Sequence, residues 1–100
     1  MNEMTVATIG LEFNPKEKFA VKIINLPKNA EIFSVKVKEN NPTIWVTYMA
    51  PSENFKLDYS EISFVICSCK YTQIEFDKHI YLGNIDINND SYAVFYKKKQ

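Results

Sequence analysis

Seven short apolar stretches separated by polar turns run through this chain, and none of them keeps the 3.6-residue apolar period of a helix. Ile and Val, with 11 and 7 residues, far outnumber the 4 Leu residues, and Phe and Tyr are abundant. Side chains of these types lose rotamer freedom in a helix but pack well on a pleated sheet. The stretches predicted to form strands are 5–13, 19–26, 32–38, 43–49, 62–71, 79–87 and 92–96. We therefore expect an all-β fold, a single small antiparallel sandwich or partly open barrel of about six to seven hairpin-connected strands.

Alternation along the strands predicts which side chains share a face. In the third stretch, apolar and polar residues alternate cleanly, which is typical of a half-buried strand. In the sixth stretch, Gly83 interrupts the strand and indicates a bulge. The predicted inward face of the third stretch is Phe33, Val35 and Val37, and the predicted shared face of the sixth is Tyr81, Ile85 and Ile87.

A length of 100 residues is enough for one domain with a hydrophobic core. We expect a single all-β domain over 1–100 whose Lys-rich end, 97–100, is solvated and frayed. No apolar run approaches the roughly 18 residues of a membrane span, and the first residues lack the pattern of a signal peptide. The two cysteines stand two positions apart and cannot build a disulfide scaffold, so the expected location is a reducing cytoplasm.

Cys67, Cys69 and His79 are the candidate soft metal ligands, and the set is incomplete for zinc, which takes three or four protein ligands. A thiol enzyme would need one of the cysteines beside His79, with a third group such as Asp77 to orient the imidazole. That arrangement requires the fifth and sixth stretches to pair. Free cysteine more often serves as a small buried apolar residue. We therefore expect no catalytic residue, no metal and no cofactor.

All 12 basic residues are lysines, and 12 acidic residues balance them to a net charge of zero. Arginine supplies the bidentate fork that reads guanine edges and clamps phosphates. Lys36 and Lys38 form a short stripe on one strand, where lysines more often prevent edge-to-edge pairing. Because scattered acidic residues oppose a phosphate field, we expect no nucleic-acid partner. We expect no membrane partner either.

Four of the predicted strands, at 19–26, 43–49, 62–71 and 79–87, are apolar on both faces. No amphipathic helix is predicted to cover a second face, and a sandwich buries one face of each sheet. Apolar surface is therefore left over, and such patches on small proteins mark interaction sites. Aromatic residues and Met are the usual anchors. The residues predicted to contact a partner are Trp45, Tyr48, Met49, Phe76, Tyr81, Lys36 and Lys38.

The stretch LPKNAEIFSVKV at 26–37, followed by PTIW at 42–45 and YLG at 81–83, resembles a family of small proteins encoded by tailed bacteriophages. The resemblance covers about 19–96 and consists of turns and core positions, so it implies the fold more than the function. The family has no assigned activity. Many members carry Gly-Thr-Gly-His where this chain has CKYT at 69–72, and no role of that segment is transferred.

These observations predict a small non-enzymatic protein that inhibits or redirects a host bacterial protein by contact. Its phage resemblance points to an anti-defence inhibitor, such as an anti-CRISPR protein, on context alone. Two alternatives stay open from the sequence. The chain could form a homo-oligomer that sequesters a small signalling nucleotide with Lys and aromatic contacts at its subunit interfaces, or it could be an accessory component of the virion.

Overall fold

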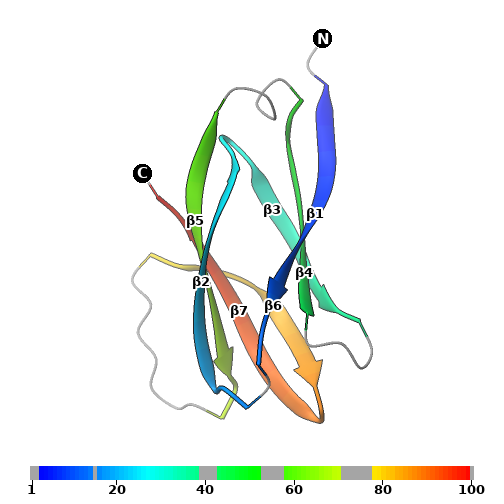
Figure 1. The fold of residues 1–100 in the computed structure, drawn as a ribbon, viewed down its shortest axis with the longest axis vertical. Helices are drawn as coiled ribbons and strands as arrows, with labels where there is room; N and C mark the ends of the chain where they lie inside the picture. The colour runs from blue at the N-terminus through cyan, green and yellow to red at the C-terminus, as the bar shows by residue number, and fades with distance from the viewer. Residues whose placement is uncertain (1–2, 15, 39–42, 53–57, 71–77, 100) are drawn as a thin grey trace.

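The structure is a computed structural model that describes residues 3–14, 16–38, 43–52, 58–70 and 78–99. Within these ranges the chain forms strands and no helix (Figure 1). The strands are β1 (Met4–Glu12), β2 (Phe19–Pro27), β3 (Glu31–Val37), β4 (Thr43–Pro51), β5 (Tyr59–Ser68), β6 (Ile80–Ile87) and β7 (Asp90–Lys98). Each stretch predicted to be a strand overlaps one of these strands, which confirms the all-β prediction; the predicted end of the fifth stretch is corrected from 71 to Ser68.

The strands form two antiparallel sheets packed as a sandwich, with no closed barrel. The three-stranded sheet has the order β1-β4-β3, and the four-stranded sheet has the order β2-β5-β7-β6. Among the described strands, β3 with β4 and β6 with β7 are paired neighbours in sequence, whereas the chain passes from one sheet to the other between β1 and β2, β2 and β3, and β4 and β5. β7 lies between β5 and β6, so these two strands do not pair. β3 and β6 pack against each other and close one side of the sandwich.

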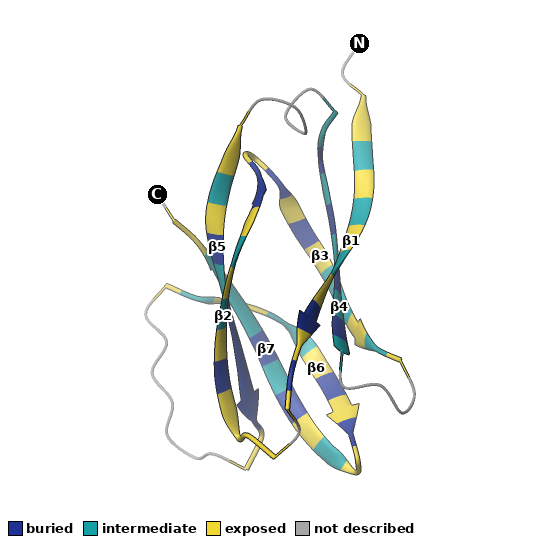
Figure 2. Cartoon of the chain, in the orientation of Figure 1, coloured by how far each residue is buried: buried dark blue, intermediate teal, exposed yellow. Residues whose placement is uncertain are grey.

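The core lies between the sheets and is built from alternate residues of each strand, as Figure 2 shows by the regular change from buried to exposed along the strands. Buried and less buried residues alternate along β1, β2 and β4, where Leu11, Leu26 and Val46 are almost fully buried. A ring contact joins the sheets, since Phe13 meets Tyr92 edge to face at 5.0 Å between ring centroids. Each such side chain contributes about 1.5–3 kcal/mol by its burial.

A bulge in β3 changes the face on which Phe33 lies. Ile32 pairs with Tyr48 and Ser34 pairs with Thr47, so Phe33 is the extra residue between two consecutive pairs. Its side chain is 51% exposed, and Ile32 takes the inward place instead. The prediction that Phe33 shares the inward face with Val35 was therefore wrong, because alternation counts residues and one extra residue reverses the face.

A second bulge lies in β6, between Tyr81 and Gly83, which confirms the bulge predicted at this glycine. It places Leu82 against the core and Tyr81 on the outer face, so the prediction that Tyr81 shares a face with Ile85 was wrong. A Cβ atom on Gly83 would lie 3.1 Å from Val35 Cγ1. The missing side chain thus lets β6 approach β3 closely.

The end of β7 continues further than the sequence indicates. Lys97 pairs with Ser63 and Lys98 with Ile62, and the Lys99 backbone N–H donates to the Glu61 carbonyl at 3.1 Å. The prediction of a frayed tail is corrected for these lysines, because β5 begins at Tyr59 and offers them ladder partners. The lysines therefore occupy fixed positions along the sheet.

Turns with left-handed backbone set the hairpin registers. Asn88 and Asn89 have φ of 51° and 67° and join Ile87 to its ladder partner Asp90. Two consecutive positive-φ residues are characteristic of the type I′ hairpin, whose twist matches that of the strands. Asn29 also has a positive φ of 67°, in the turn that the Ala30 N–H closes on the Pro27 carbonyl at 3.0 Å.

Candidate functional site

The outer side of the four-stranded sheet carries a continuous band of apolar side chains, which we call the apolar face. Its rows follow from the ladder register. Val21 pairs with Val65, Val65 with Phe95, and Phe95 with Tyr81, so that one row crosses all four strands. The neighbouring row crosses β2, β5 and β7 and consists of Phe19, Cys67 and Ala93. The apolar face consists of Phe19, Val21, Ile23, Val65, Cys67, Tyr81, Ala93 and Phe95.

The apolar face is buried at its centre and exposed at its sides. Val65 is 3% exposed, whereas Val21, Ile23 and Tyr81 are 49%, 65% and 55% exposed. Scattered apolar side chains are common on protein surfaces, but a contiguous group is unusual for a small protein and marks interaction sites. No residue of this group carries a charge, so a partner can cover it without desolvating one.

Two aromatic rings form the β6 side of the apolar face. Tyr81 and Phe95 meet edge to face, with ring centroids 5.5 Å apart. The Tyr81 hydroxyl donates a hydrogen bond of 2.6 Å to the Asn84 side-chain oxygen. The ring is thereby held in a defined position at the surface, which lowers the entropy that a binding partner would have to remove.

The cysteines do not form the thiol site considered from the sequence. Burial, followed by the proximity of Cys69, raises the pKa of the Cys67 thiol and so disfavours the reactive thiolate. Tyr96 pairs with both Phe64 and Ile80, so β6 begins at the level of Phe64, one residue after His79. That level is three residues from Cys67, about 10 Å along the strand. Asp77 lies outside the described residues. In the described ranges, no group of three or more His, Cys, Asp and Glu side chains could hold a metal ion.

The outer side of the three-stranded sheet, which we call the polar face, is organised around Trp45. Gly10 pairs with Trp45, and a Cβ atom on Gly10 would lie 3.2 Å from the indole Cζ3, so the indole lies across the glycine. The Lys38 ammonium stands over the indole at 5.0 Å from its centroid. The indole N–H is buried and has no acceptor among the described residues. Threonines occupy the next row, where Thr8 and Thr47 contact at 3.4 Å through their hydroxyls.

The residues predicted to bind a partner lie in different places. Trp45, Met49, Lys36 and Lys38 belong to the polar face, and Tyr81 belongs to the apolar face on the opposite side. Tyr48 faces the core and is 8% exposed, so its assignment as a contact residue is corrected. Phe76 lies outside the described residues.

The sequence-based choice missed the exposed residues of β2. Phe19, Val21 and Ile23 alternate with the core residues of the same strand, and this was the available signal. It was not decisive, because the sequence does not reveal that β2 is an edge strand with one neighbour. An edge position explains why its outer side chains stay exposed while Val65 on the adjacent strand is covered.

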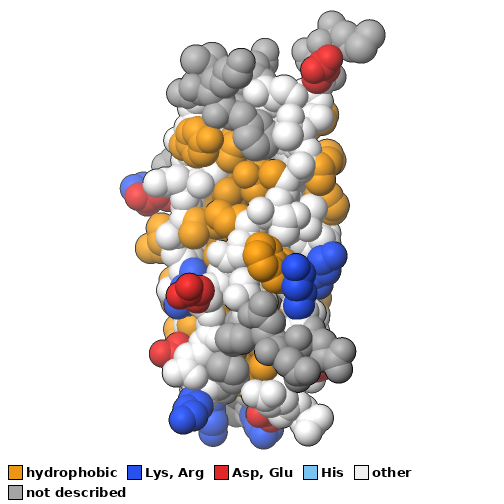
Figure 3. Space-filling view, turned by 45° about the vertical axis from the view of Figure 1, so that its right-hand side comes forward, with side chains coloured by type: hydrophobic (Ala, Val, Ile, Leu, Met, Phe, Trp, Pro, Cys, Tyr) orange, Lys and Arg blue, Asp and Glu red, His pale blue; other side chains and the backbone are white. Residues whose placement is uncertain are grey.

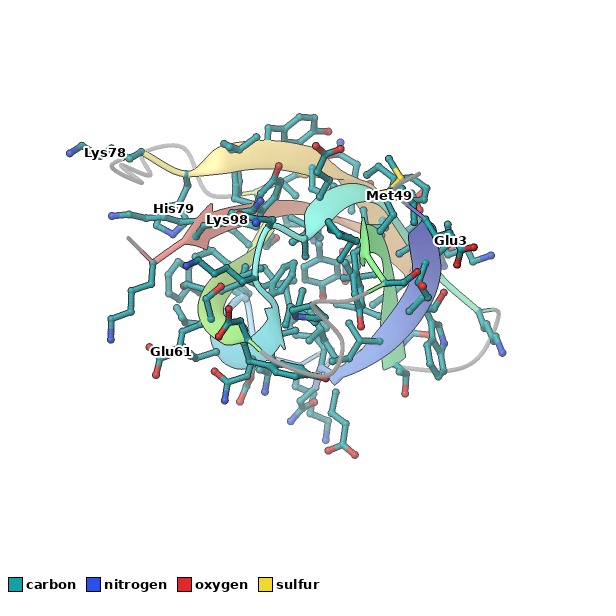
Figure 4. The ribbon with its side chains drawn as sticks, turned by 90° about the horizontal axis from the view of Figure 1, so that it is seen from above. Glu3, Met49, Glu61, Lys78, His79 and Lys98 are labelled. Atoms are coloured by element: carbon teal, nitrogen blue, oxygen red, sulfur yellow. The ribbon has the colours of Figure 1, made fainter. Side chains whose placement is uncertain are left out.

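Basic side chains gather at the end of the sheet where β6 begins and β7 ends, as Figure 4 shows for Lys78, His79 and Lys98. A hollow of about 570 Å³ there is lined by Lys78, Ile80, Tyr96, Lys97, Lys98 and Lys99. A second hollow of about 300 Å³, on the other side of the same lysines, includes Ile23, Glu61, Ser63 and His79. Glu61 accepts a hydrogen bond from Lys99 Nζ at 3.3 Å, which neutralises part of this positive charge.

Comparison of the chain with protein-family models, with curated protein sequences and with solved structures finds no match. In the described part of the chain, no helix has the length and apolar character needed to cross a membrane.

Proposed function

We propose that this protein acts by binding another protein through the apolar face, without chemistry of its own. The observation that carries the proposal is the exposure of Val21, Ile23 and Tyr81 around the buried centre at Val65. Covering apolar surface contributes about 25 cal/mol for each Å² removed from water. Tyr is among the residues enriched in binding hot spots, and surrounding contacts that exclude water support such a residue.

The chemistry of the apolar face defines the kind of partner. It offers apolar contact area, the Tyr81 hydroxyl at one side and lysines at the end near Lys97. The complementary surface is therefore apolar at its centre and acidic or polar at its rim. The resemblance to phage proteins supports a host bacterial protein as this partner, and inhibition of a defence protein as the outcome.

Capture from a bacterial host lysate tests the proposal. The immobilised wild-type protein should retain a stoichiometric partner, and Ile23→Lys should reduce the amount retained at least tenfold. The substitution places a charge at Ile23, the most exposed of the large apolar side chains of this face, where the partner would have to desolvate it. Circular dichroism of both proteins checks that the fold is unchanged.

Thr47→Lys is the matched control, because it adds the same charge to a central position of the polar face. This variant should retain the partner as well as the wild type does. Retention by Ile23→Lys together with loss by Thr47→Lys would move the binding site to the face of Trp45. Absence of a stoichiometric partner on the wild type would contradict the proposal.

A second candidate function is the binding of a small signalling nucleotide, favoured by the lysines that line the hollow of about 570 Å³ beside Tyr96. Lysines supply charge for phosphates, and an aromatic side chain supplies a surface for a base. Calorimetric titration with a cyclic dinucleotide should give heat that Lys97→Glu abolishes, whereas inorganic phosphate gives none. No heat with the cyclic dinucleotide would exclude this candidate.

A further inference from the structure

β1 differs from the other edge strands in having no feature that prevents pairing. It runs without a register shift from Met4 to Glu12 and carries no charge before Glu12 and no proline. Its only described neighbour is β4. Long, regular, uncharged edge strands present unpaired backbone groups on which another strand can form a ladder. Figure 3, with this side of the molecule turned forward, shows hydrophobic side chains reaching the surface.

The other three edges are protected in different ways. β3 and β6 each contain a bulge, and they pack against each other. β2 has Lys22 on its core-facing side, where the side chain lines a hollow with Glu12 and Glu17, and the strand ends at Pro27. Bulges, inward-pointing charges and proline are established means of blocking edge-to-edge association. The contrast singles out β1 as the edge available for pairing.

The hydrogen-bond pattern shows which groups of β1 face the open edge. The Ser52 N–H donates to the Glu3 carbonyl at 2.9 Å, and the ladder register places these two residues opposite each other. Backbone groups point alternately to the two sides of a strand. The N–H and C=O groups of Val6, Thr8 and Gly10, together with those at both ends of the strand, therefore point away from β4.

From this geometry we propose that β1 pairs with β1 of a second copy of this chain, antiparallel and about a two-fold axis at Thr8. This register uses the whole strand, because Met4 meets the partner's Glu12 and Val6 meets the partner's Gly10. It places no two like charges opposite each other. A register centred on Ala7 would leave part of the described strand unpaired.

The side chains on the polar face favour a second copy as the occupant. Val6 is 61% exposed. In the proposed register its side chain lies beside the partner's Gly10, over which the partner's Trp45 indole extends. Each copy thus offers an aromatic surface at the place where the other offers an exposed valine. The two three-stranded sheets then become one six-stranded sheet. This dimer leaves the apolar face uncovered, so it is separate from the proposed binding of a partner protein.

Sedimentation over a range of protein concentrations tests the pairing. The measured mass should rise from 11.7 kDa towards twice that value as the concentration increases. Thr8→Lys should remain at the monomer mass, because two lysines would stand directly opposite each other at the axis. Ile23→Lys adds the same charge to the β2 edge and should dimerise as the wild type does.

A mixture of two charge variants distinguishes pairing at Thr8 from unfolding. Thr8→Glu alone should also be monomeric, whereas an equimolar mixture of Thr8→Lys and Thr8→Glu should recover the dimer, since opposite charges then meet at the axis. Val6→Pro, which removes an edge-facing N–H, should be monomeric, and Val21→Pro, its counterpart on β2, should dimerise.

A wild-type protein that stays at 11.7 kDa at all concentrations would overturn the proposal, as would a dimer that Thr8→Lys leaves intact. Neither result affects the partner-binding test, because that test depends on Ile23 and this one on Thr8. If the protein captures no partner but still dimerises, the proposed pairing of β1 remains supported.

Discussion

The two outer faces of the sandwich differ at their centres, although both carry exposed apolar side chains, which on the polar face are Met4, Val6 and Phe33. On the polar face, Trp45 lies across Gly10 beneath Lys38, and the row beside it consists of hydroxyl side chains. On the apolar face, Val21 and Ile23 have apolar or small neighbours across the strand and stay largely exposed. The Trp45 indole is thus packed against other groups of the chain, whereas Val21 and Ile23 remain largely exposed.

The largest aromatic residue therefore does not by itself locate a binding surface. Gly10 provides the space in which the indole lies, and Lys38 provides a cation above it, an interaction of about 0.5–1 kcal/mol at an exposed site. Val21 and Ile23 on β2, by contrast, are 49% and 65% exposed. The exposed band is therefore the stronger candidate for contact with a partner.

The strongest effect on stability is expected at the buried centre of the apolar face, in contrast to the half-buried Thr47 of the polar face. Val65→Ala should lower the free energy of unfolding by about 2 kcal/mol, because it removes buried methyl groups and leaves a cavity. Thr47→Ala, at a central position of the polar face, should change it by no more than about 0.5 kcal/mol. Urea unfolding of both variants measures the difference. Equal losses would show that the two faces are equally packed.

A smaller effect is expected at Gly10, because a side chain added there would push the Trp45 indole away from the strand. In Gly10→Ala, the new Cβ would lie 3.0 Å from Thr43 Cγ2 and 3.2 Å from Trp45 Cζ3, so the indole must move. The crowding outweighs the gain from a stiffer unfolded chain, and we expect a net loss of about 1 kcal/mol. A shift of the Trp emission should accompany it. Higher stability with unchanged emission would contradict the described packing.

The smallest effect at neutral pH comes from two buried tyrosines, one on the inner side of each sheet. Burial, and secondarily Tyr59 for Tyr48 and Asp90 for Tyr92, raises the pKa of both phenols above the ordinary value of 10.0. A raised pKa means that the folded state favours the neutral phenol, so this contribution is complete below pH 10 and is lost as the pH rises through the folded pKa.

The melting temperature should therefore be constant between pH 7 and about pH 9 as far as these phenols are concerned, and it should fall above about pH 10. Tyr48→Phe should reduce the alkaline fall by removing one of the two ionisations. An alkaline fall of the same size in Tyr48→Phe and in Tyr92→Phe as in the wild type would assign it to other groups.

Much of the fold could be predicted from the sequence, because alternation and turn residues act locally. The approximate strand positions follow from side-chain period and β propensity. The bulges at Phe33 and Leu82 could not be placed in the same way, because an extra residue is defined only against a partner strand. Phe33 and Tyr81 were consequently assigned to the wrong faces.

The candidate site could be predicted only in part for a related reason. The sequence indicates that β2 and β5 are apolar on both sides, which correctly predicts surplus apolar surface. Whether Val21 or Val65 is the exposed member of a row depends on which strand lies at the edge, and this is a property of the sheet order. The choice of Trp45 and Tyr48 over Val21 and Ile23 followed residue type instead of position in the sheet.

The structure of the complex with the captured host protein is the most direct test of the proposed binding surface. We expect Val21, Ile23 and Tyr81 to become buried against the partner, while Trp45 and Lys38 keep their contact on the opposite side. A complex in which the partner covers Trp45 and leaves Ile23 in solvent would contradict the account.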